Sequence, residues 1–302
     1  MANSLLPPRS IGIFAAPYKP QAAELAQQLV RLCEARGVEA HVQEDCARAI
    51  ERNDLSCGDD EKIARCDILV TLSGDGGVLS AARAAAPHGT PVLAVDLGRL
   101  GFLSAVRPSA LEGAFDQLMA GDYEIEERMM IDARVMRADE KGELCEVGGS
   151  IGLNDAVVAK SALARILQLS IFVENELVAT VRADGLVIST PTGSTAYALS
   201  AGGPIVHPEV QLMLLCPICA HSLTQRPLVV GAAETVEILT EWEGEEVGAS
   251  ELEAMLTVDG QIGVALQSGD RVRIQRSAIS TKLVRFPDDT FYHRLREKMR
   301  WG

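Results

Sequence analysis

Asp67–Gly77 reads DILVTLSGDGG and carries the clearest structural signal in the chain. Its first six residues are apolar almost throughout, which is typical of a strand that is covered on both faces. Glycines follow at once, and the next segment, Gly77–Ala86, has a helical pattern. A strand that passes through a glycine turn into a helix predicts a parallel α/β sheet.

The residues on either side of this segment repeat the alternation of strands and helices. Ser10–Ala16, Val38–Gln43 and Pro91–Leu97 are predicted strands. Gln21–Arg36 is a predicted helix because its leucines share one face, and Gly37 supplies the stop signal. Strands that are joined through helices pair in parallel by right-handed crossovers. Residues 1–124 are therefore predicted to form an α/β domain.

The next part of the chain, residues 125–280, changes to short β-rich runs. Turn signals separate several runs, and Asp259-Gly260 is a hairpin signal between two of them. The pattern predicts a mostly antiparallel domain, followed by a tail, 281–302, in which Arg294–Trp301 is expected to form a short helix. The predicted strands are Arg134–Arg137, Ile151–Ala159, Ile166–Glu174, Leu177–Arg182, Leu186–Ser189, Leu228–Val230, Thr235–Leu239, Leu252–Val258, Ile262–Leu266 and Arg271–Gln275.

The composition limits the classes of function. The chain has 302 residues, enough for two domains, and its apolar content of 47% is that of a globular protein. A net charge of −14 argues against a nucleic-acid partner, which selects a basic surface. No apolar run approaches the ~20 residues of a membrane span, and the first residues lack the apolar stretch of a signal peptide. We therefore expect no membrane partner.

The cysteines indicate a reducing compartment. Seven are scattered along the chain, an odd number that does not suit a disulfide framework. A cytoplasmic protein is therefore expected. Cys216-Pro-Ile-Cys219 is the one suggestive pair. A metal or redox role stays open for it, but burial as small hydrophobic side chains is favoured.

The turn Ser73–Gly77 has a composition that suits phosphate chemistry. Glycines at a strand-to-helix turn let backbone N–H groups approach a phosphate, and the helix N-terminus adds partial positive charge. The turn is neither a Walker A loop nor a GxGxxG fingerprint. Asp75 repels a phosphate, but it makes sense as the group that takes a proton from an acceptor hydroxyl. A tight turn with Asp75 as the helix cap is the alternative.

A second candidate is the segment Asp184–Pro204, which reads DGLVISTPTGSTAYALSAGGP. Its hydroxyls and glycines crowd a loop that enters a helix near Thr195. They offer small donors for ribose and phosphate oxygens, and a capped turn is the alternative.

Polar residues inside apolar surroundings supply the third candidate. Asn154 and Asp155 stand at the centre of a predicted strand, where two polar residues cost stability unless they are satisfied, so one of them can point at a ligand. Arg165 and Arg182 are candidate cations for a pyrophosphate or a neighbouring carboxylate. Solvated surface positions are the alternative for both arginines.

Together these segments resemble the NAD kinase family. Ser73–Gly77 is similar to the family's Gly-Gly-Asp-Gly-Thr loop, with Ser73 in place of Gly and Gly77 in place of Thr. Asn154-Asp155 resembles its Asn-Glu/Asp pair, and Asp184–Pro204 is nearly its long glycine/threonine motif. Further similar segments, which extend the likeness over most of the chain, are Leu97–Leu103, His221–Leu228, Thr257–Gln261 and Phe291–Gly302.

The resemblance implies an α/β plus β fold. The N-terminal domain is expected to be Rossmann-like and similar to phosphofructokinase, the C-terminal domain to be β-sandwich-like, and the tail to return to the first domain. NAD is expected between the two domains. The family phosphorylates the adenosine 2′-hydroxyl of NAD with ATP and Mg²⁺ to give NADP and ADP, and some members accept polyphosphate. Its members are cytoplasmic and usually oligomeric, so a homodimer or homotetramer is expected.

The resemblance also implies roles for individual residues. Asp75 would accept the proton, Gly76 would adjoin the substrate, and Phe102 would lie near the adenine. The remaining residues that the resemblance places at NAD are Asn154, Asp155, Arg165, Arg182, Asp184, Thr195, Ala196, Tyr197, Ala198, Leu199, Ser200 and Gln261.

Two other functions share some of these features. A lipid kinase of the diacylglycerol or sphingosine type also carries a Gly-Asp-Gly turn, but the long loop and the lack of a basic or apolar membrane-facing stretch argue against it. A non-catalytic NAD-binding regulator is the alternative of another class.

The two departures in the turn leave the Asp75 carboxylate and the backbone donors in place. Gly77 removes a hydroxyl that could cap the helix or contact a phosphate, and Ser73 is small. Activity with ATP and Mg²⁺ is therefore expected to survive both departures.

Overall fold

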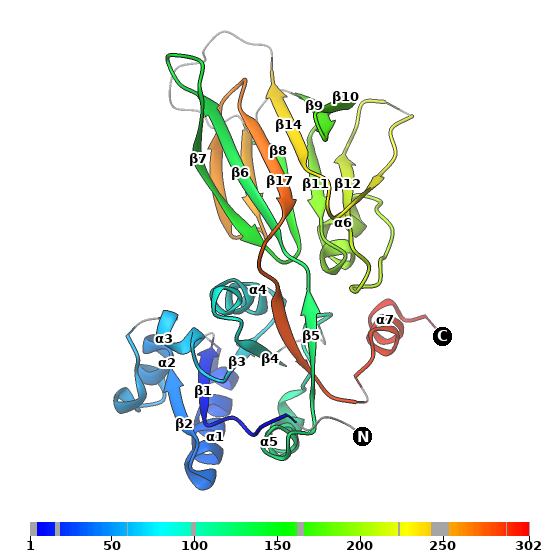
Figure 1. The fold of residues 1–302 in the computed structure, drawn as a ribbon. Helices are drawn as coiled ribbons and strands as arrows, with labels where there is room; N and C mark the ends of the chain where they lie inside the picture. The colour runs from blue at the N-terminus through cyan, green and yellow to red at the C-terminus, as the bar shows by residue number, and fades with distance from the viewer. Residues whose placement is uncertain are drawn as a thin grey trace. The chain divides into compact units, whose positions relative to one another are not determined.

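The computed structural model describes residues 5–15, 19–58, 60–97, 101–161, 166–222, 224–242, 254–287 and 289–301. The chain divides into two compact units (Figure 1). Met1–Arg128 and Ile279–Gly302 make the first unit, and Met129–Ala278 makes the second. The C-terminal segment thus belongs to the same unit as the N-terminal part of the chain.

The first unit is built on a mixed sheet. Its strands are β1 Ser10–Ala15, β2 Glu39–Val42, β3 Ile68–Ser73, β4 Pro91–Asp96, β5 Glu124–Arg128 and β18 Thr281–Arg285. Among the described residues these six strands lie in the order β2-β1-β3-β4-β18-β5. Neighbours from β2 to β18 run parallel, and β5 pairs antiparallel with β18. The predicted α/β architecture is therefore confirmed.

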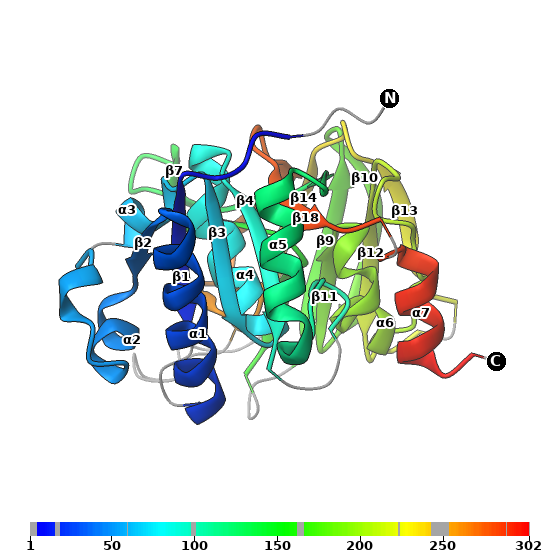
Figure 2. The same cartoon turned by 90° about the horizontal axis from the view of Figure 1, so that it is seen from below.

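Helices cover both faces of this sheet. The helices of this unit are α1 Pro20–Arg36, α2 Glu44–Ala49, α3 Asp60–Ala64, α4 Asp75–Ala85, α5 Leu111–Ala120 and, after β18, α7 Phe291–Met299. Ile68, Val70 and Leu72 of β3 share a core with α1 and α5, which lie side by side across one face of the sheet in Figure 2. Thr71 and Ser73 alternate with them and face α4. Helices on both faces explain why β3 is buried throughout.

A buried ion-pair cluster joins β5 to β18. The Glu126 carboxylate accepts from Arg128 Nη2 at 2.8 Å and from Arg285 Nε at 2.7 Å, and both arginine side chains are buried. Burial alone would raise the pKa of Glu126, but the two guanidinium groups outweigh it and lower that pKa to about 2. Arg285 Nη1 also donates to the Leu103 carbonyl at 2.9 Å. The C-terminal segment therefore holds the stretch of chain that follows β4.

The second unit contains two antiparallel sheets. One consists of β6 Ile131–Ala138, β7 Leu144–Gly152, β9 Leu167–Val173, β10 Glu176–Ala183, β14 Val236–Glu241 and β17 Arg271–Arg276. The other consists of β8 Asp155–Lys160, β11 Gly185–Ser189, β12 Leu212–Ile218, β13 Leu228–Gly231, β15 Ala254–Val258 and β16 Ile262–Leu266. Within the described residues their strand orders are β10-β9-β14-β17-β6-β7 and β13-β12-β11-β8-β15-β16.

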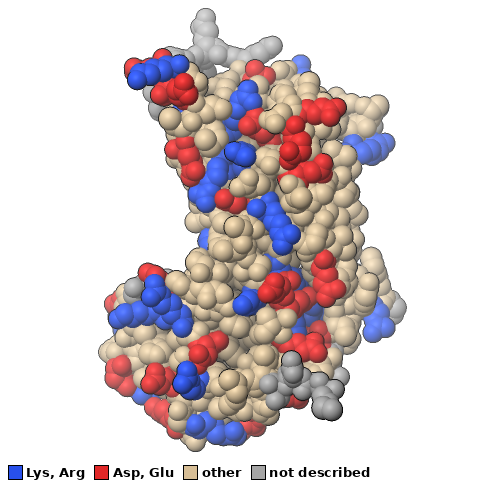
Figure 3. Space-filling view, viewed as in Figure 1, with Lys and Arg blue, Asp and Glu red and all other residues tan. Residues whose placement is uncertain are grey.

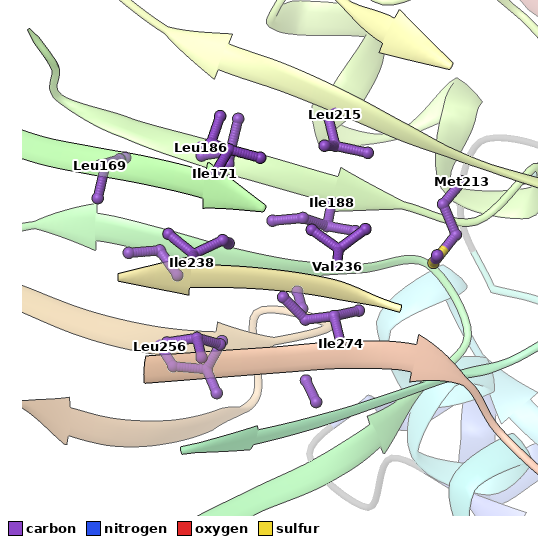
Figure 4. Close-up of a cluster of buried hydrophobic side chains, with 14 of the residues drawn as sticks. Leu169, Ile171, Leu186, Ile188, Met213, Leu215, Val236, Ile238, Leu256 and Ile274 are labelled. Carbon is purple, nitrogen blue, oxygen red and sulfur yellow. The ribbon is translucent and has the colours of Figure 1, made fainter. Parts of the chain in front are cut away.

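An aliphatic core fills the space between these two sheets (Figure 4). Ile171 and Ile238 of the first sheet are buried in one cluster with Ile188 and Leu256 of the second. Two sheets that face each other across a shared apolar layer form a β-sandwich. The expectation of a β-sandwich-like C-terminal domain is confirmed.

The two cysteines of the Cys-Pro-Ile-Cys segment are divided between core and surface. Cys216 is fully buried in β12, in a hydrophobic cluster with Val187 and Leu214. Cys219 lies just beyond the end of β12 and is exposed. The predicted burial is confirmed for Cys216 and wrong for Cys219, because the strand that carries the first cysteine into the core ends before the second.

The surface shows charges of both signs. On the face drawn in Figure 3, Lys and Arg side chains are interspersed with Asp and Glu side chains rather than gathered in one basic area. A mixed face of this kind is not the surface that tracks a phosphate backbone. None of the helices among the described residues combines the length and the apolar composition that a membrane crossing requires.

Candidate active site

The Gly-Asp-Gly turn connects β3 directly to α4. β3 ends at Ser73, Gly74 is the N-cap residue, and α4 begins at Asp75. The Gly77 N–H donates to the Gly74 carbonyl at 2.9 Å. Asp75 and the exposed Gly76 therefore occupy the first turn of a helix, where the helix dipole favours negative charge.

The Asp75 carboxylate lies against the backbone of Gly101 and Phe102. The Phe102 N–H donates to Oδ2 at 3.3 Å. A Cβ atom at position 101 would lie 1.9 Å from Oδ1, so this approach requires glycine. Asp96 fixes the same segment, because its Oδ2 accepts from the Gly101 N–H at 2.7 Å. Oδ1 of Asp75 is buried and has no hydrogen-bond partner among the described residues.

This environment raises the pKa of Asp75 above its ordinary value. Burial is the main cause, because it disfavours the charged form. The charge of Lys298 and the N–H of Phe102 lower the pKa, and the charge of Asp96 raises it. A partly buried carboxyl group with a raised pKa, whose buried Oδ1 has no hydrogen-bond partner among the described residues, is suited to take a proton from a hydroxyl.

Ser73 and Gly77, the two departures from the family's turn, compete for the same space. A Cβ atom at Gly77 would lie 2.2 Å from Ser73 Oγ and 2.4 Å from Ser73 Cβ. Ser73 is buried and extended in β3, and its hydroxyl hydrogen-bonds with Thr71 Oγ1 at 2.8 Å and with the Gly74 carbonyl at 3.1 Å. The Ser73 side chain thus occupies the space that a side chain at position 77 would need, so the two departures are expected to be energetically coupled.

Gly77→Thr is expected to lower the free energy of unfolding by about 1–3 kcal/mol, because the added side chain overpacks against Ser73. The double variant Ser73→Gly/Gly77→Thr is expected to recover most of that loss. Urea unfolding of both single variants and the double variant measures the coupling. Gly113→Thr on α5 is the control, since a Cβ atom there meets no atom within 4 Å beyond its chain neighbours and the backbone of its own helix. If the changes in the free energy of unfolding of the two single variants simply add up in the double variant, the two positions are not coupled.

In the second unit, the hydroxyl-rich loop after β11 docks onto the chain before β8. Thr190 Oγ1 donates to the Leu153 carbonyl at 2.5 Å and accepts from the Gly193 N–H at 3.1 Å. Gly193 itself lies so close that a Cβ atom would be 2.1 Å from the Asn154 carbonyl oxygen. Part of the polar content that suggested a ligand therefore builds the loop itself.

The loop continues as a 3-10 turn, Thr192–Thr195, and the short helix α6, Tyr197–Ser200, so the predicted helix near Thr195 is confirmed. A cavity of about 390 Å³ lies beside it, within the range of small-molecule sites. Four of the predicted NAD-binding residues line this cavity together with five others. The lining consists of Asn154, Asp155, Ala196 and Tyr197 with Val157, Ala159, Thr257, Asp259 and Gly260.

The other predicted NAD-binding residues of this unit do not line the cavity. Arg182 is exposed on β10, and Asp184 lies between β10 and β11 with its Oδ1 3.6 Å from Lys160 Nζ. Ala198 is buried in a hydrophobic cluster, and Gln261 is exposed in the turn between β15 and β16. Thr195, Leu199 and Ser200 are also outside the lining, and Arg165 lies outside the described residues.

Asp259, predicted as part of a hairpin turn and of a segment that resembles the family, organises one wall of the cavity. Its Oδ1 accepts from the N–H groups of Asn154 at 2.7 Å and Asp155 at 3.2 Å, and its Oδ2 accepts from the Leu153 N–H at 2.9 Å. The Asp259 carboxylate thus accepts hydrogen bonds from backbone N–H groups that would otherwise pair with a neighbouring strand. The chain bends at this point, between β7 and β8. The prediction of one continuous strand over Ile151–Ala159 is therefore wrong.

The bend brings two carboxyl groups together. Asp155 is 5% exposed, and burial, followed by the charge of Asp259, raises its pKa to about 7. A carboxyl group that titrates near neutral pH at the edge of a cavity is typical of a functional site. The hydrogen-bonding capacity of Asp155 at this cavity therefore changes near neutral pH.

Comparisons with known proteins agree with this arrangement. Residues 11–123 match the family model of the ATP-NAD kinase N-terminal domain, and residues 153–286 match that of the ATP-NAD kinase C-terminal domain. The NAD kinase of Citrifermentans bemidjiense is 42% identical over 97% of this chain and 99% of that protein. The NAD kinase of Moorella thermoacetica is 42% identical over 97% of this chain and 89% of that protein.

Two solved structures share the fold. Yeast NADH kinase in complex with NADH matches with a TM-score of 0.88 at 26% identity, over 98% of this chain and 88% of that chain. An NAD kinase from Archaeoglobus fulgidus in complex with ATP matches with a TM-score of 0.73 at 21% identity, over 96% of this chain and 98% of that chain. Both halves of the sequence match the same family, and relatives match over nearly the full length, so this chain belongs to the NAD kinase family.

Proposed function

We propose that this protein transfers the γ-phosphoryl group of ATP to the adenosine 2′-hydroxyl of NAD, giving NADP and ADP, with Asp75 as the general base. The observation that carries the proposal is Oδ1 of Asp75, which is buried in the first turn of α4 without a hydrogen-bond partner among the described residues. A buried acceptor of this kind lacks the bond that a substrate hydroxyl would supply. Full-length relatives named NAD kinase support the same reaction.

In the proposed reaction Asp75 takes the proton of the 2′-hydroxyl while the oxygen of that hydroxyl bonds to the γ-phosphorus of ATP. The bond between that phosphorus and the β,γ-bridging oxygen breaks, and ADP leaves. Most of the catalysis in such transfers comes from positioning and charge neutralisation. Gly76 adjoins the reacting groups in this proposal, because the N-terminus of α4 offers backbone N–H groups and partial positive charge to phosphate oxygens.

The second unit is proposed to bind NAD through the cavity beside α6. Asn154 and Asp155 supply hydrogen-bonding groups there, and Ala196 and Tyr197 line the same space. The similar structure of yeast NADH kinase was solved in complex with NADH, which supports a dinucleotide as the ligand. Arg165, Arg182, Asp184, Thr195, Ala198, Leu199, Ser200 and Gln261 remain proposed contributors to NAD binding, and Phe102 of the first unit remains the proposed neighbour of the adenine.

ATP is proposed to bind as its Mg²⁺ complex, in which the cation neutralises charge on the triphosphate. Across the described ranges of the chain, no group of three or more His, Cys, Asp or Glu side chains is placed to hold a metal ion. We therefore expect phosphate oxygens and water to supply most of the ligands of Mg²⁺, without an all-protein cage.

Formation of NADP tests the proposed function. The purified protein is incubated with NAD, Mg²⁺ and either ATP or polyphosphate, and NADP is measured with an NADP-specific dehydrogenase. NADP is expected with ATP. Binding of NAD without NADP from any donor would instead support a non-catalytic regulator, and phosphorylation of diacylglycerol or sphingosine would support a lipid kinase.

We further propose a homodimer or homotetramer that forms chiefly through the second unit. Within the described sheets β10 and β13 are edge strands, and both carry exposed apolar side chains. These are Leu177 and Val178 on β10, and Leu228 and Val229 on β13. Apolar edge strands favour pairing with another chain. Light scattering at micromolar concentration is expected to give a dimer or tetramer mass, and a monomer mass would end this proposal.

A further inference from the structure

The C-terminal helix α7 carries a lysine to the Asp75 turn. Lys298 lies half-buried in the last turn of α7. Its Nζ is 5.6 Å from the centroid of the Phe102 ring, within the range of a cation–π contact. The backbone N–H of the same Phe102 donates to Asp75 Oδ2. The ammonium group and the catalytic carboxylate are thus linked through one residue.

Contacts that do not involve Lys298 hold α7 in this position. Thr290 caps its N-terminus by accepting from the His293 N–H at 3.2 Å. Arg294 is buried and pairs with Asp289 at 2.6 Å. Glu297 pairs with Arg107, in the segment that leads into α5, at 3.0 Å. A substitution at position 298 is therefore expected to leave the helix in place.

Asp75 needs a compensating charge. Its carboxyl group faces the carboxylate of Asp96 from β4, the ammonium group of Lys298 from α7, and the backbone N–H groups of Phe102 and Leu103. Burial and Asp96 both favour the protonated form, in which Asp75 cannot act as a base. The turn Ser73–Gly77 itself contains no Lys or Arg, so the C-terminal helix supplies a cation that the turn lacks.

We propose that Lys298 is a positioning residue for Asp75, whose ammonium group offsets the burial of that carboxylate and keeps it ionised to accept the proton of the substrate hydroxyl. The proposal rests on the assignment of Asp75 as the general base. It gives the C-terminal segment a function in the reaction beyond its place in the sheet, because α7 sets the pH range over which the base works. The direction of the Lys298 effect on the pKa of Asp75, downward, agrees with this role.

The test is the pH profile of kcat/KM for NAD in the full-length protein, compared with that of Lys298→Met. Activity needs the ionised base, so it falls as the pH drops through the pKa of Asp75 in the free enzyme. Loss of the cation raises that pKa, and the acidic limb is expected to move up by about one pH unit. At a pH below this limb, kcat/KM of Lys298→Met is expected to be approximately tenfold lower than that of the wild type. On the plateau at higher pH the two values are expected to be close.

Two control variants separate this role from a general effect of charge or structure. Arg296→Met removes one positive charge from the exposed face of the same helix and is expected to leave the limb unchanged. Lys298→Arg keeps the charge and is expected to restore the wild-type limb. An unshifted limb in Lys298→Met, or an equal loss of activity at every pH, would overturn the proposal.

A readout without turnover distinguishes failure of this proposal from failure of the proposed function. Carboxyl ¹³C NMR of the protein without substrates reports the titration of Asp75 directly, with Asp75→Asn used to assign its signal. A higher pKa of Asp75 in Lys298→Met is expected even if no NADP can be detected from any donor. An absence of NADP together with that shift would refute the kinase assignment alone, whereas an unchanged pKa would refute the role of Lys298.

Discussion

Asp75→Asn is expected to lower the turnover number by ~100-fold or more while leaving the fold and most of the NAD affinity intact. Asparagine has the same shape as aspartate, and its carbonyl oxygen can still accept from the Phe102 N–H. It cannot take a proton from a hydroxyl. Steady-state NADP formation measures the loss of turnover, calorimetric titration measures NAD binding, and urea unfolding measures stability.

The partly buried position of Asp75 makes this variant informative. Removal of a carboxylate that is disfavoured by burial is not expected to reduce stability, so a large loss of turnover would reflect chemistry. Asp116→Asn on α5 is the control, because it makes the same change of charge on an exposed side chain of the same unit. Turnover close to wild type in Asp75→Asn would leave Asp75 as a turn residue only.

Asp259→Asn is expected to raise KM for NAD by about 10- to 100-fold, with a smaller effect on KM for ATP. The variant replaces a carboxylate that accepts three backbone N–H groups by a neutral amide. Weakening charge-assisted hydrogen bonds costs about 1.5–3 kcal/mol, and 1.4 kcal/mol is a factor of ten in affinity. The bend that presents Asn154 and Asp155 to the cavity would then lose its support.

The pH dependence of NAD binding gives this variant a second signature. The charge of Asp259 helps to raise the pKa of Asp155 to about 7. Without that charge the pKa of Asp155 falls, and any change in NAD affinity that follows its titration is expected to move to lower pH. A titration of NAD affinity between pH 5 and 8 in both proteins measures the shift.

Asp270→Asn separates the loss of a buried turn carboxylate from an effect on the NAD cavity. Asp270 is 1% exposed in the same unit, pairs with Arg137 at 2.7 Å and accepts from the Gln267 N–H at 2.8 Å, but it does not line the cavity. Its variant is expected to lose stability and keep the wild-type KM for NAD. An equal rise of KM in both variants, or none in Asp259→Asn, would contradict the role of Asp259.

Much of the fold can be predicted from the sequence because local patterns report burial. Asp67–Leu72 is apolar at almost every position, and the structure buries all of β3 between two layers of helices. Gly37 predicts the end of the first helix, and it takes the left-handed conformation there with φ 67°. In the second unit the scarcity of aromatic residues predicts an aliphatic core, which the two sheets enclose.

The site is less predictable because it depends on contacts between distant residues. No local pattern shows that Asp259 takes the N–H groups of residues 153–155, so the bend there looks like an apolar strand. Nothing near Lys298 in the sequence indicates that it approaches Asp75. Both residues do lie in segments that resemble the family, Thr257–Gln261 and Phe291–Gly302, and that likeness was the available signal.

The pair Ser73 and Gly77 in the turn could be predicted in part from the sequence. Ser73 and Gly77 are both recognisable in the sequence as departures from the family's loop. Considered separately, each raises its own question about strain or a lost hydroxyl. A Cβ atom at position 77 would lie 2.2 Å from Ser73 Oγ, so the two positions compete for space, and this contact is visible in the fold and not in the sequence pattern.

A single-turnover experiment with ATP labelled radioactively at its γ-phosphate tests the central claim most directly. Enzyme in excess over labelled ATP is mixed with saturating NAD and Mg²⁺, quenched at intervals and separated by chromatography, and the labelled position is identified by nuclease digestion. The proposed function predicts that the label passes from ATP to the 2′-phosphate of NADP, and that Asp75→Asn slows this transfer by ~100-fold or more. Label that appears only as inorganic phosphate, or on another position of NAD, would contradict it.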